Sequence, residues 1–206
     1  MIFLPSEGVR EGFLPYTKRN VIAQAFKLLG GPYSWGGKEA GWDCSALTQD
    51  VFGIFGIKLP RNSSWQAQVG EEIAAFMRST PTEYKLDTTH LWQPAVTFLR
   101  LPGHIMLYLG EDDGKPYAIH AIWGVPDKDG NIIKVNKVAV TDLDLGLGGW
   151  KGSLLERITD VRGVYLDLSS PQSRGYMNKG GSLPVLLDAR FSSFFLAACF
   201  LLLDSA

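Results

Sequence analysis

The sequence predicts an α+β fold in which helices of the first half pack on an antiparallel sheet formed by the second half. Apolar residues recur at helical spacing in residues 17–31 and 44–56. After residue 93 they fall instead into short runs rich in β-branched and aromatic residues, separated by turn signals. A block of helices followed by a block of strands is typical of α+β domains.

The length and composition indicate one globular domain. A chain of 206 residues is long enough for a substantial core, and 46% hydrophobic with 20% charged residues is an ordinary balance. The formal net charge of −1 offers no basic field, so neither nucleic acid nor an anionic membrane is an expected partner. The first twelve residues lack the basic and long apolar regions of a signal peptide, and we expect none.

The helices can be placed from their caps. The first is expected over residues 17–31, with Thr17 as the N-cap. The second begins at Cys44, behind Asp43 as the N-cap. A third candidate helix lies within residues 59–79, after a turn, and is capped at Ser63 or Ser64.

Five runs in the second half are expected to be strands. Glycine- and aspartate-rich segments separate several of them, as in a sheet built from hairpins. The runs cover residues 95–101, 104–110, 116–124, 132–140 and 161–168.

Cys44 stands where a glycine-rich loop meets the second helix. A structural cysteine would be expected along the apolar stripe of Leu47, Val51 and Phe55, whereas Cys44 stands at the polar N-terminal end of that stripe. In the first turn of a helix, unpaired N–H groups and the helix dipole stabilise a thiolate, so we expect a lowered thiol pKa. The carboxylate of Asp43 would repel that thiolate unless it turns toward backbone donors. Position alone leaves a buried apolar role equally open.

His104 and His120 lie on neighbouring strands that are expected to form a hairpin about Asp112 or the Asp112–Asp113 bond. With the turn centred at Asp112, the two imidazoles stand directly opposite each other on one face of the sheet, and a turn shifted by one residue still leaves them neighbours. One can accept the thiol proton while the other holds the first in its working tautomer. A lone histidine is more often structural, but the pair together with a helix-start cysteine favours a catalytic set. His90 has no such partner and is expected in a loop.

These motifs together resemble the NlpC/P60 family of papain-like cysteine peptidases, which cut peptides of the bacterial cell wall. The resemblance covers about residues 16–168 and follows the order Cys, His, His. It rests on "PYSWGG" (32–37), "DCSAL" (43–47), "GIKLPRNSSWQ" (56–66), "PGHIMLYLG" (102–110) and "AIHAIWG" (118–124).

The resemblance implies roles for the candidate catalytic residues. Cys44 would be the nucleophile, His104 the general base and later acid, and His120 its orienter. The implied reaction is hydrolysis of the bond between γ-D-glutamate and a diamino acid in murein peptides, with no cofactor and no metal.

Substrate-binding roles follow from the same resemblance. Asp43 would pair with the ammonium of an N-terminal L-Ala, Ser45 would bind the peptide, and Tyr33 and Trp35 would line the cleft.

The resemblance also divides the chain. Relatives often carry bacterial SH3-type modules before the catalytic domain, so residues 1–16 are expected to be a linker or the remnant of such a module. Residues 17–168 would form the catalytic domain, and residues 169–206 a tail of unknown role. The apolar run 191–203 in that tail is expected to be a packed terminal helix or strand. Location would be periplasmic or cell-wall-associated, with cytoplasmic recycling as the alternative.

Three other interpretations stay open. An amidase or an acyltransferase can use the same Cys-His-His set. Cys44, His104 and His120 could also be three zinc ligands, although no fourth ligand is evident. A non-catalytic wall-binding module, in which the thiol is incidental, is the third.

Overall fold

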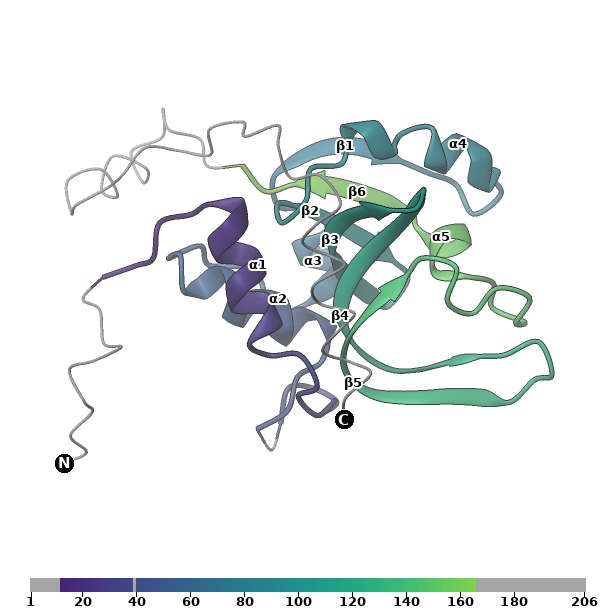
Figure 1. The fold of residues 1–206 in the computed structure, drawn as a ribbon, viewed down its shortest axis with the longest axis horizontal. Helices are drawn as coiled ribbons and strands as arrows, with labels where there is room; N and C mark the ends of the chain where they lie inside the picture. The colour runs from purple at the N-terminus through teal and green to yellow at the C-terminus, as the bar shows by residue number, and fades with distance from the viewer. Residues whose placement is uncertain (1–11, 39, 166–206) are drawn as a thin grey trace.

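A computed structural model describes residues 12–38 and 40–165. Within these residues a six-stranded antiparallel sheet carries helices on both faces (Figure 1), which confirms the predicted α+β class. In chain order the elements are α1 (Lys18–Phe26), α2 (Cys44–Gly53), α3 (Ser63–Gln66), β1 (Glu71–Ala75), α4 (Thr82–Leu86), the short 3₁₀ helix η1 (Thr89–Leu91), β2 (Thr97–Leu101), β3 (His104–Asp112), β4 (Lys115–Pro126), β5 (Ile132–Asp142), α5 (Leu154–Arg157) and β6 (Asp160–Gly163).

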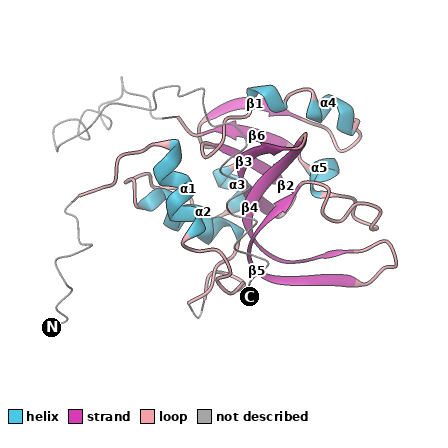
Figure 2. Cartoon of the chain, viewed as in Figure 1, coloured by secondary structure: helices cyan, strands magenta, loops and turns pink. Residues whose placement is uncertain are grey.

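The sheet has the strand order β1-β6-β2-β3-β4-β5. The long strands β3, β4 and β5 lie side by side and form a meander that ends at one edge, as Figure 2 shows in magenta. Helices α1 and α2 lie on one side of the sheet, whereas α4 and α5 lie toward the other (Figure 1). The site residues come from α2 and from the strands in the middle of the order.

The first core fills the space between the sheet and helices α1 and α2. Thr17 caps α1 as predicted, because its Oγ1 accepts a hydrogen bond from the Asn20 N–H at 3.2 Å. The helix ends at Phe26, earlier than expected, and turns follow it. Apolar residues of both helices and of the turn after α2 are fully or almost fully buried against the sheet. They include Val21, Ala25, Leu47, Val51, Phe52 and Phe55, packed with Phe98, Leu107 and Ile119.

The predicted third helix is mostly wrong. Asn62, one residue before the predicted serines, caps a helix of only four residues. The chain then enters β1, which pairs with β6 at the edge of the sheet. Gly70 marks the change, with a φ of 77° and a backbone so close to Gly163 that a Cβ would collide with it. This segment forms a strand despite its helical pattern, because its backbone can pair with the open edge of β6.

The hairpin of β3 and β4 forms as predicted, but in a different register. Its turn is Asp113–Gly114, whose φ values of 49° and 70° are those of a two-residue turn that matches the twist of a hairpin. Leu107 pairs with Ile119, and a bulge shifts the ladder beyond Tyr108. His104 and His120 are therefore two positions out of alignment, and the prediction that they stand directly opposite each other is wrong.

The second core lies on the other face of the sheet. Trp92 packs edge-on against Tyr108 there, with ring centroids 5.4 Å apart. Beside this core, Lys85 of α4 is fully buried, and its ammonium donates hydrogen bonds to three backbone carbonyls around the end of α5. The acceptors are the carbonyl oxygens of Glu156 at 2.7 Å, Ile158 at 2.8 Å and Leu155 at 3.4 Å. Lys85 therefore joins α4 to α5.

Replacing Lys85 by methionine is expected to destabilise the protein by about 2–4 kcal/mol. Methionine fills a similar volume, but it leaves the carbonyls of Glu156 and Ile158 buried without a donor. Thermal and urea unfolding measure the loss. Lys58→Met, at an exposed lysine, is the matched control and should change stability by less than about 0.5 kcal/mol. Equal stability of the two variants would contradict the assignment.

The two ends of the described region contact each other beside the first core. The Tyr16 hydroxyl donates to the Val164 carbonyl at 2.7 Å, and the Tyr16 ring packs against Phe52 and Phe55. The last residue of the predicted linker is thus part of this core. The predicted tail from residue 169, with its apolar run 191–203, lies outside the described residues. Within residues 12–38 and 40–165, no helix has the length and apolar character needed to cross a bilayer.

Candidate active site

Cys44 is the first residue of α2, as predicted. Asp43 has an extended backbone and its Oδ1 accepts a hydrogen bond from the Ala46 N–H at 2.8 Å, which makes it the N-cap. The thiol therefore stands in the first turn, where backbone N–H groups have no helical acceptor. Only 8% of Cys44 is exposed, so the sulfur lies at the edge of the first core rather than in open solvent.

The sulfur of Cys44 lies against the start of β3. The backbone N–H of Ile105, the residue after His104, hydrogen-bonds the thiolate form. Burial nevertheless raises the pKa of Cys44, and the N–H groups of Ile105, Ser45 and Cys44 itself only partly offset the rise. The Asp43 carboxylate raises that pKa further. The expectation of a lowered thiol pKa was wrong, because loss of solvent outweighs the helix N-terminus here.

His104 and His120 form a hydrogen-bonded pair despite the altered register. His104 Nε2 lies 2.7 Å from His120 Nδ1, and the rings cross edge to face with centroids 5.0 Å apart. Residues at even positions of both strands face the second core, so the imidazoles share one face diagonally. With Nε2 engaged, Nδ1 is the nitrogen of His104 that is available to a thiol.

Burial keeps both imidazoles neutral. Loss of solvent lowers the pKa of His104 to about 4; the positive charge of Arg157 lowers it further and the carboxylate of Asp43 opposes the shift. The pKa of His120 is lowered well below its ordinary value, first by burial and then by His104. The action of Asp43 on His104 shows that the N-terminus of α2 and the start of β3 are neighbours.

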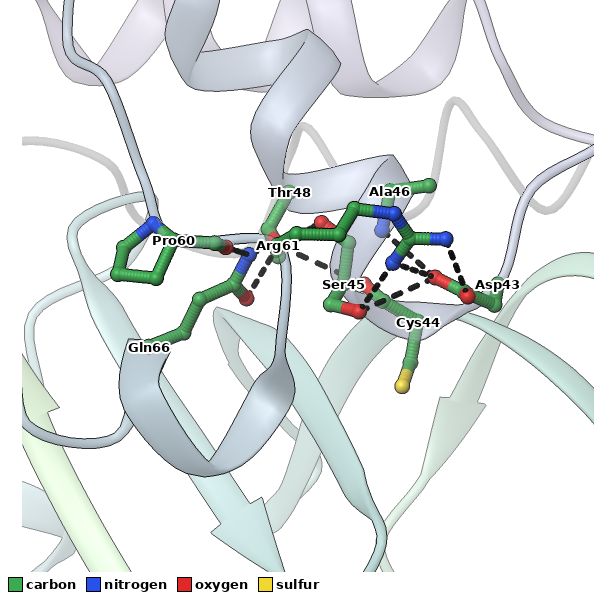
Figure 3. A network of polar contacts seen from close by, with 8 residues as sticks. All are labelled: Asp43, Cys44, Ser45, Ala46, Thr48, Pro60, Arg61 and Gln66. Atoms are coloured by element: carbon green, nitrogen blue, oxygen red, sulfur yellow. Dashed lines mark hydrogen bonds and ion pairs between the residues drawn. The ribbon is translucent and has the colours of Figure 1, made fainter. Parts of the chain in front are cut away.

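Arg61 organises the polar side of the site, as Figure 3 shows. Its guanidinium contacts both carboxylate oxygens of Asp43, at 3.0 Å to Oδ1 and 2.7 Å to Oδ2, and reaches the Ser45 hydroxyl at 2.9 Å. Burial alone would raise the pKa of Asp43, but the hydrogen bonds from Arg61 and from the Ala46 N–H lower it overall. The Cys44 side chain points away from this network (Figure 3).

Gln66 ties this network to the rest of α2. It is fully buried, and its amide nitrogen donates to the carbonyls of Ser45 at 3.0 Å and Pro60 at 2.7 Å. The Thr48 hydroxyl donates to the Gln66 amide oxygen at 2.7 Å. The segment after α2 therefore folds back on the helix start. No local pattern in the sequence links Arg61 to Asp43 or Ser45, because these partners lie 18 and 16 positions away.

The loop before α2 brings Tyr33 to the site but leaves Trp35 in solvent. This loop is tied to the edge of β5, where the Tyr33 N–H donates to the Asn136 carbonyl at 3.1 Å. Burial raises the pKa of Tyr33, and the charges of Cys44 and Asp43 raise it further. The Trp35 side chain is 82% exposed.

Arg157 is a charged neighbour that the sequence gave no reason to select. It is the last residue of α5, whose Leu154 and Leu155 pack in the second core, on the face of the sheet that carries the histidines. Its positive charge acts on His104 across a sequence separation that no local pattern reveals. Among the described residues, no group of three or more His, Cys, Asp or Glu side chains is arranged to hold a metal ion.

A family model matches the stretch that contains this geometry. Residues 30–122, from the loop before α2 to the strand of His120, match the model of the NlpC/P60 family. This stretch belongs to the NlpC/P60 family. The resemblance seen in the sequence is therefore confirmed, and Cys44, His104 and His120 all lie inside the matched stretch.

Curated relatives are similar to short parts of this chain. The bifunctional muramidase/DL-endopeptidase CwlT of Bacillus subtilis is 43% identical over 56 residues, which are 26% of this chain and 17% of that protein. The gamma-DL-glutamyl hydrolase of the same organism is 46% identical over 57 residues, 26% of this chain and 14% of the relative. The chain thus spans less than a fifth of the length of either relative.

Solved structures share the fold of the NlpC/P60 domain. An NlpC/P60 endopeptidase from Photobacterium damselae subsp. piscicida superposes with a TM-score of 0.59 at 23% identity, over 71% of this chain and 38% of that one. An NlpC/P60 family protein from Bacillus cereus gives a TM-score of 0.51 at 18% identity, over 73% and 41% of the two chains. At these identities the likeness concerns the fold alone.

Proposed function

We propose that this NlpC/P60 domain is a cysteine endopeptidase that hydrolyses the bond between γ-D-glutamate and a diamino acid in murein peptides. One observation carries the proposal: Cys44, the first residue of α2, lies against the start of β3, where His104 forms a hydrogen bond with His120. A nucleophile, a base and an orienting group are the parts that acyl transfer requires. The relatives named as DL-endopeptidase and gamma-DL-glutamyl hydrolase support the choice of bond.

In the proposed mechanism the resting pair is a neutral thiol and a neutral imidazole. Burial disfavours the charged form of both groups, since it raises the pKa of Cys44 and lowers that of His104 to about 4. The proton passes from the Cys44 thiol to His104 Nδ1 as the sulfur attacks the scissile carbonyl carbon. The imidazolium that forms donates through Nε2 to His120 Nδ1, along the 2.7 Å contact.

Acylation and hydrolysis then use the same groups in turn. The oxyanion of the tetrahedral intermediate is proposed to bind the Cys44 backbone N–H, which has no helical acceptor in the first turn of α2. When the C–N bond breaks, His104 returns its proton to the leaving amine and the acyl group stays on sulfur. Neutral His104 next takes a proton from water, whose oxygen attacks the thioester, and the thiol is regenerated.

We propose that Asp43, Ser45 and Tyr33 bind the amino-terminal part of the peptide. Asp43 and Ser45 flank Cys44 and contact Arg61, and the charges of Asp43 and Cys44 both act on Tyr33. Arg61 holds the Asp43 carboxylate in place and balances its negative charge with the guanidinium. An incoming ammonium would therefore share that carboxylate with the guanidinium. Exposed Trp35 is proposed as the outer wall of the cleft.

Digestion of L-Ala-γ-D-Glu-meso-diaminopimelate, followed by mass spectrometry, tests the proposal. The expected products are L-Ala-D-Glu and free diaminopimelate, with no release by Cys44→Ala. Cleavage at another amide, or transfer of the acyl group to an added amine, would point to the amidase or acyltransferase interpretation. Binding of the tripeptide without any turnover would identify a non-catalytic module and overturn the proposal.

The acid limb of the pH–rate profile is expected near pH 4 rather than near 6.5. The base must be neutral to accept the thiol proton, and it is protonated below its pKa, so a pKa lowered to about 4 moves the loss of activity to lower pH. Measuring kcat/KM for the tripeptide against pH checks this. The positive charge of Arg157 lowers the pKa of His104, so Arg157→Gln should raise that pKa and move the acid limb to higher pH. A wild-type limb at 6.5 would contradict the assigned environment.

A further inference from the structure

The Thr141 side chain extends the hydrogen-bonded pair of His104 and His120 by a third polar group. His120 Nε2 lies 3.1 Å from the Thr141 hydroxyl, while His120 Nδ1 is engaged with His104. Thr141 belongs to β5, where it pairs with Ala118, and His120 pairs with Ala139. Thr141 and His120 are thus diagonal neighbours on one face of the sheet. Because His120 is fully buried, its two ring nitrogens depend on these two partners.

Two proton arrangements satisfy this chain at rest. In the first, His104 Nε2–H donates to His120 Nδ1, and His120 Nε2–H donates to the Thr141 oxygen. In the second, every hydrogen bond is reversed, and the Thr141 hydroxyl donates to His120 Nε2. The first leaves His104 Nδ1 with a free lone pair, whereas the second puts a proton on it. Only the first arrangement presents a base to Cys44.

Once His104 is protonated, only the first of the two proton arrangements is possible. An imidazolium donates at both nitrogens, so His120 Nδ1 must then be an acceptor. His120 must carry its proton on Nε2, and that buried N–H needs an acceptor in turn. The Thr141 oxygen, 3.1 Å away, supplies it. Valine at this position would fill the same space without a lone pair.

We propose that Thr141 is a positioning residue whose hydroxyl accepts a hydrogen bond from His120 Nε2–H and so holds His104 in the tautomer with a free Nδ1. The inference rests on the proposed function for its rate effect, but not for its effect on the imidazoles. Thr141 acts through His120 and makes no contact with the substrate in this scheme. Its hydroxyl matters most when His104 carries the thiol proton.

Thr141→Val and Thr141→Ser, compared with the wild type, test the proposal. We expect Thr141→Val to lower kcat for the tripeptide about 10- to 100-fold with KM changed less than about twofold, because one buried N–H loses its acceptor. Thr141→Ser keeps the oxygen and should retain at least about a third of the wild-type kcat. Thr97→Val is the matched control, since it removes a fully buried strand hydroxyl that accepts from the Gln93 N–H, away from the histidines. It should alter stability without this loss of kcat.

Two readouts do not depend on the substrate. Nitrogen-15 spectra of the histidine rings should show His120 protonated at Nε2 in the wild type and in Thr141→Ser, with that tautomer lost in Thr141→Val. The rate of Cys44 alkylation by iodoacetamide at neutral pH, followed by peptide mapping, should fall in Thr141→Val alone. An unchanged tautomer and an unchanged alkylation rate in Thr141→Val would overturn the proposal, as would an equal loss of kcat in Thr97→Val.

The two proposals fail in different ways. A wild-type protein that leaves the tripeptide intact but shows the expected tautomer and alkylation differences would refute the peptidase function and support the role of Thr141. Cleavage of the tripeptide with equal kcat in wild type and Thr141→Val would support the peptidase function and refute the role of Thr141.

Discussion

Replacing Cys44 by serine is expected to lower kcat/KM for the murein tripeptide by about 10⁴-fold or more. Serine fits the site and keeps a hydroxyl in the place of the thiol, but a hydroxyl is far less acidic. With the pKa of His104 lowered to about 4, its imidazole is a weak base and cannot activate serine as it activates the more acidic thiol. Steady-state kinetics by chromatography of the released diamino acid measures the loss.

The control for this substitution is Cys199→Ser, which removes the other thiol of the chain and should leave kcat/KM unchanged. Thermal unfolding of both variants shows whether the fold is kept. A Cys44→Ser protein with more than a few per cent of wild-type activity would mean that the thiol is not the nucleophile. The proposed acyl-enzyme mechanism would then be wrong, although the fold assignment would stand.

Replacing His104 by glutamine is expected to lower kcat/KM by about 10²- to 10⁴-fold, the usual contribution of a general base. Glutamine is chosen because its amide N–H can still donate to His120 Nδ1, along the contact that is 2.7 Å in the wild type. The pair geometry is thus largely preserved while the proton acceptor is lost. Alkylation of Cys44 by iodoacetamide should slow in parallel, since the thiol has lost its base.

His90→Gln is the matched histidine control. His90 lies exposed in η1, where its Nδ1 contacts the Asp87 carbonyl at 2.6 Å, remote from α2 and β3 along the chain. It should keep wild-type activity and Cys44 reactivity. Loss of activity in His90→Gln equal to that in His104→Gln would show that the effect is on folding rather than on proton transfer. An active His104→Gln protein would remove His104 from the mechanism.

Local signals in the sequence were sufficient for the helix that carries the thiol. Asp43 before Cys44 predicts the cap and the first turn, and the structure places both as expected. The alternating runs from residue 104 onward predict the hairpin that presents the two histidines. These features depend on side chains a few residues apart, so a short stretch of sequence specifies them.

Register and short helices were less predictable. A two-residue turn at Asp113–Gly114, in place of one at Asp112, shifts every partner along the hairpin, and several neighbouring turn residues suit either choice. The segment Glu71–Ala75 has a helical pattern but becomes an edge strand, because β6 offers a free ladder there. β6 follows it by 85 positions or more, so no local rule reaches it.

The sequence by itself selected the candidate catalytic residues: a thiol at a helix start, two imidazoles on adjacent strands, and a family pattern that spans them. Only the tertiary structure decided their electrostatics, because the protonation of each group depends on how much solvent is lost and on which distant charges approach. Burial reversed the expected direction for the Cys44 pKa, and Arg61, Arg157 and Thr141 reached the site from elements that no spacing rule connects to it.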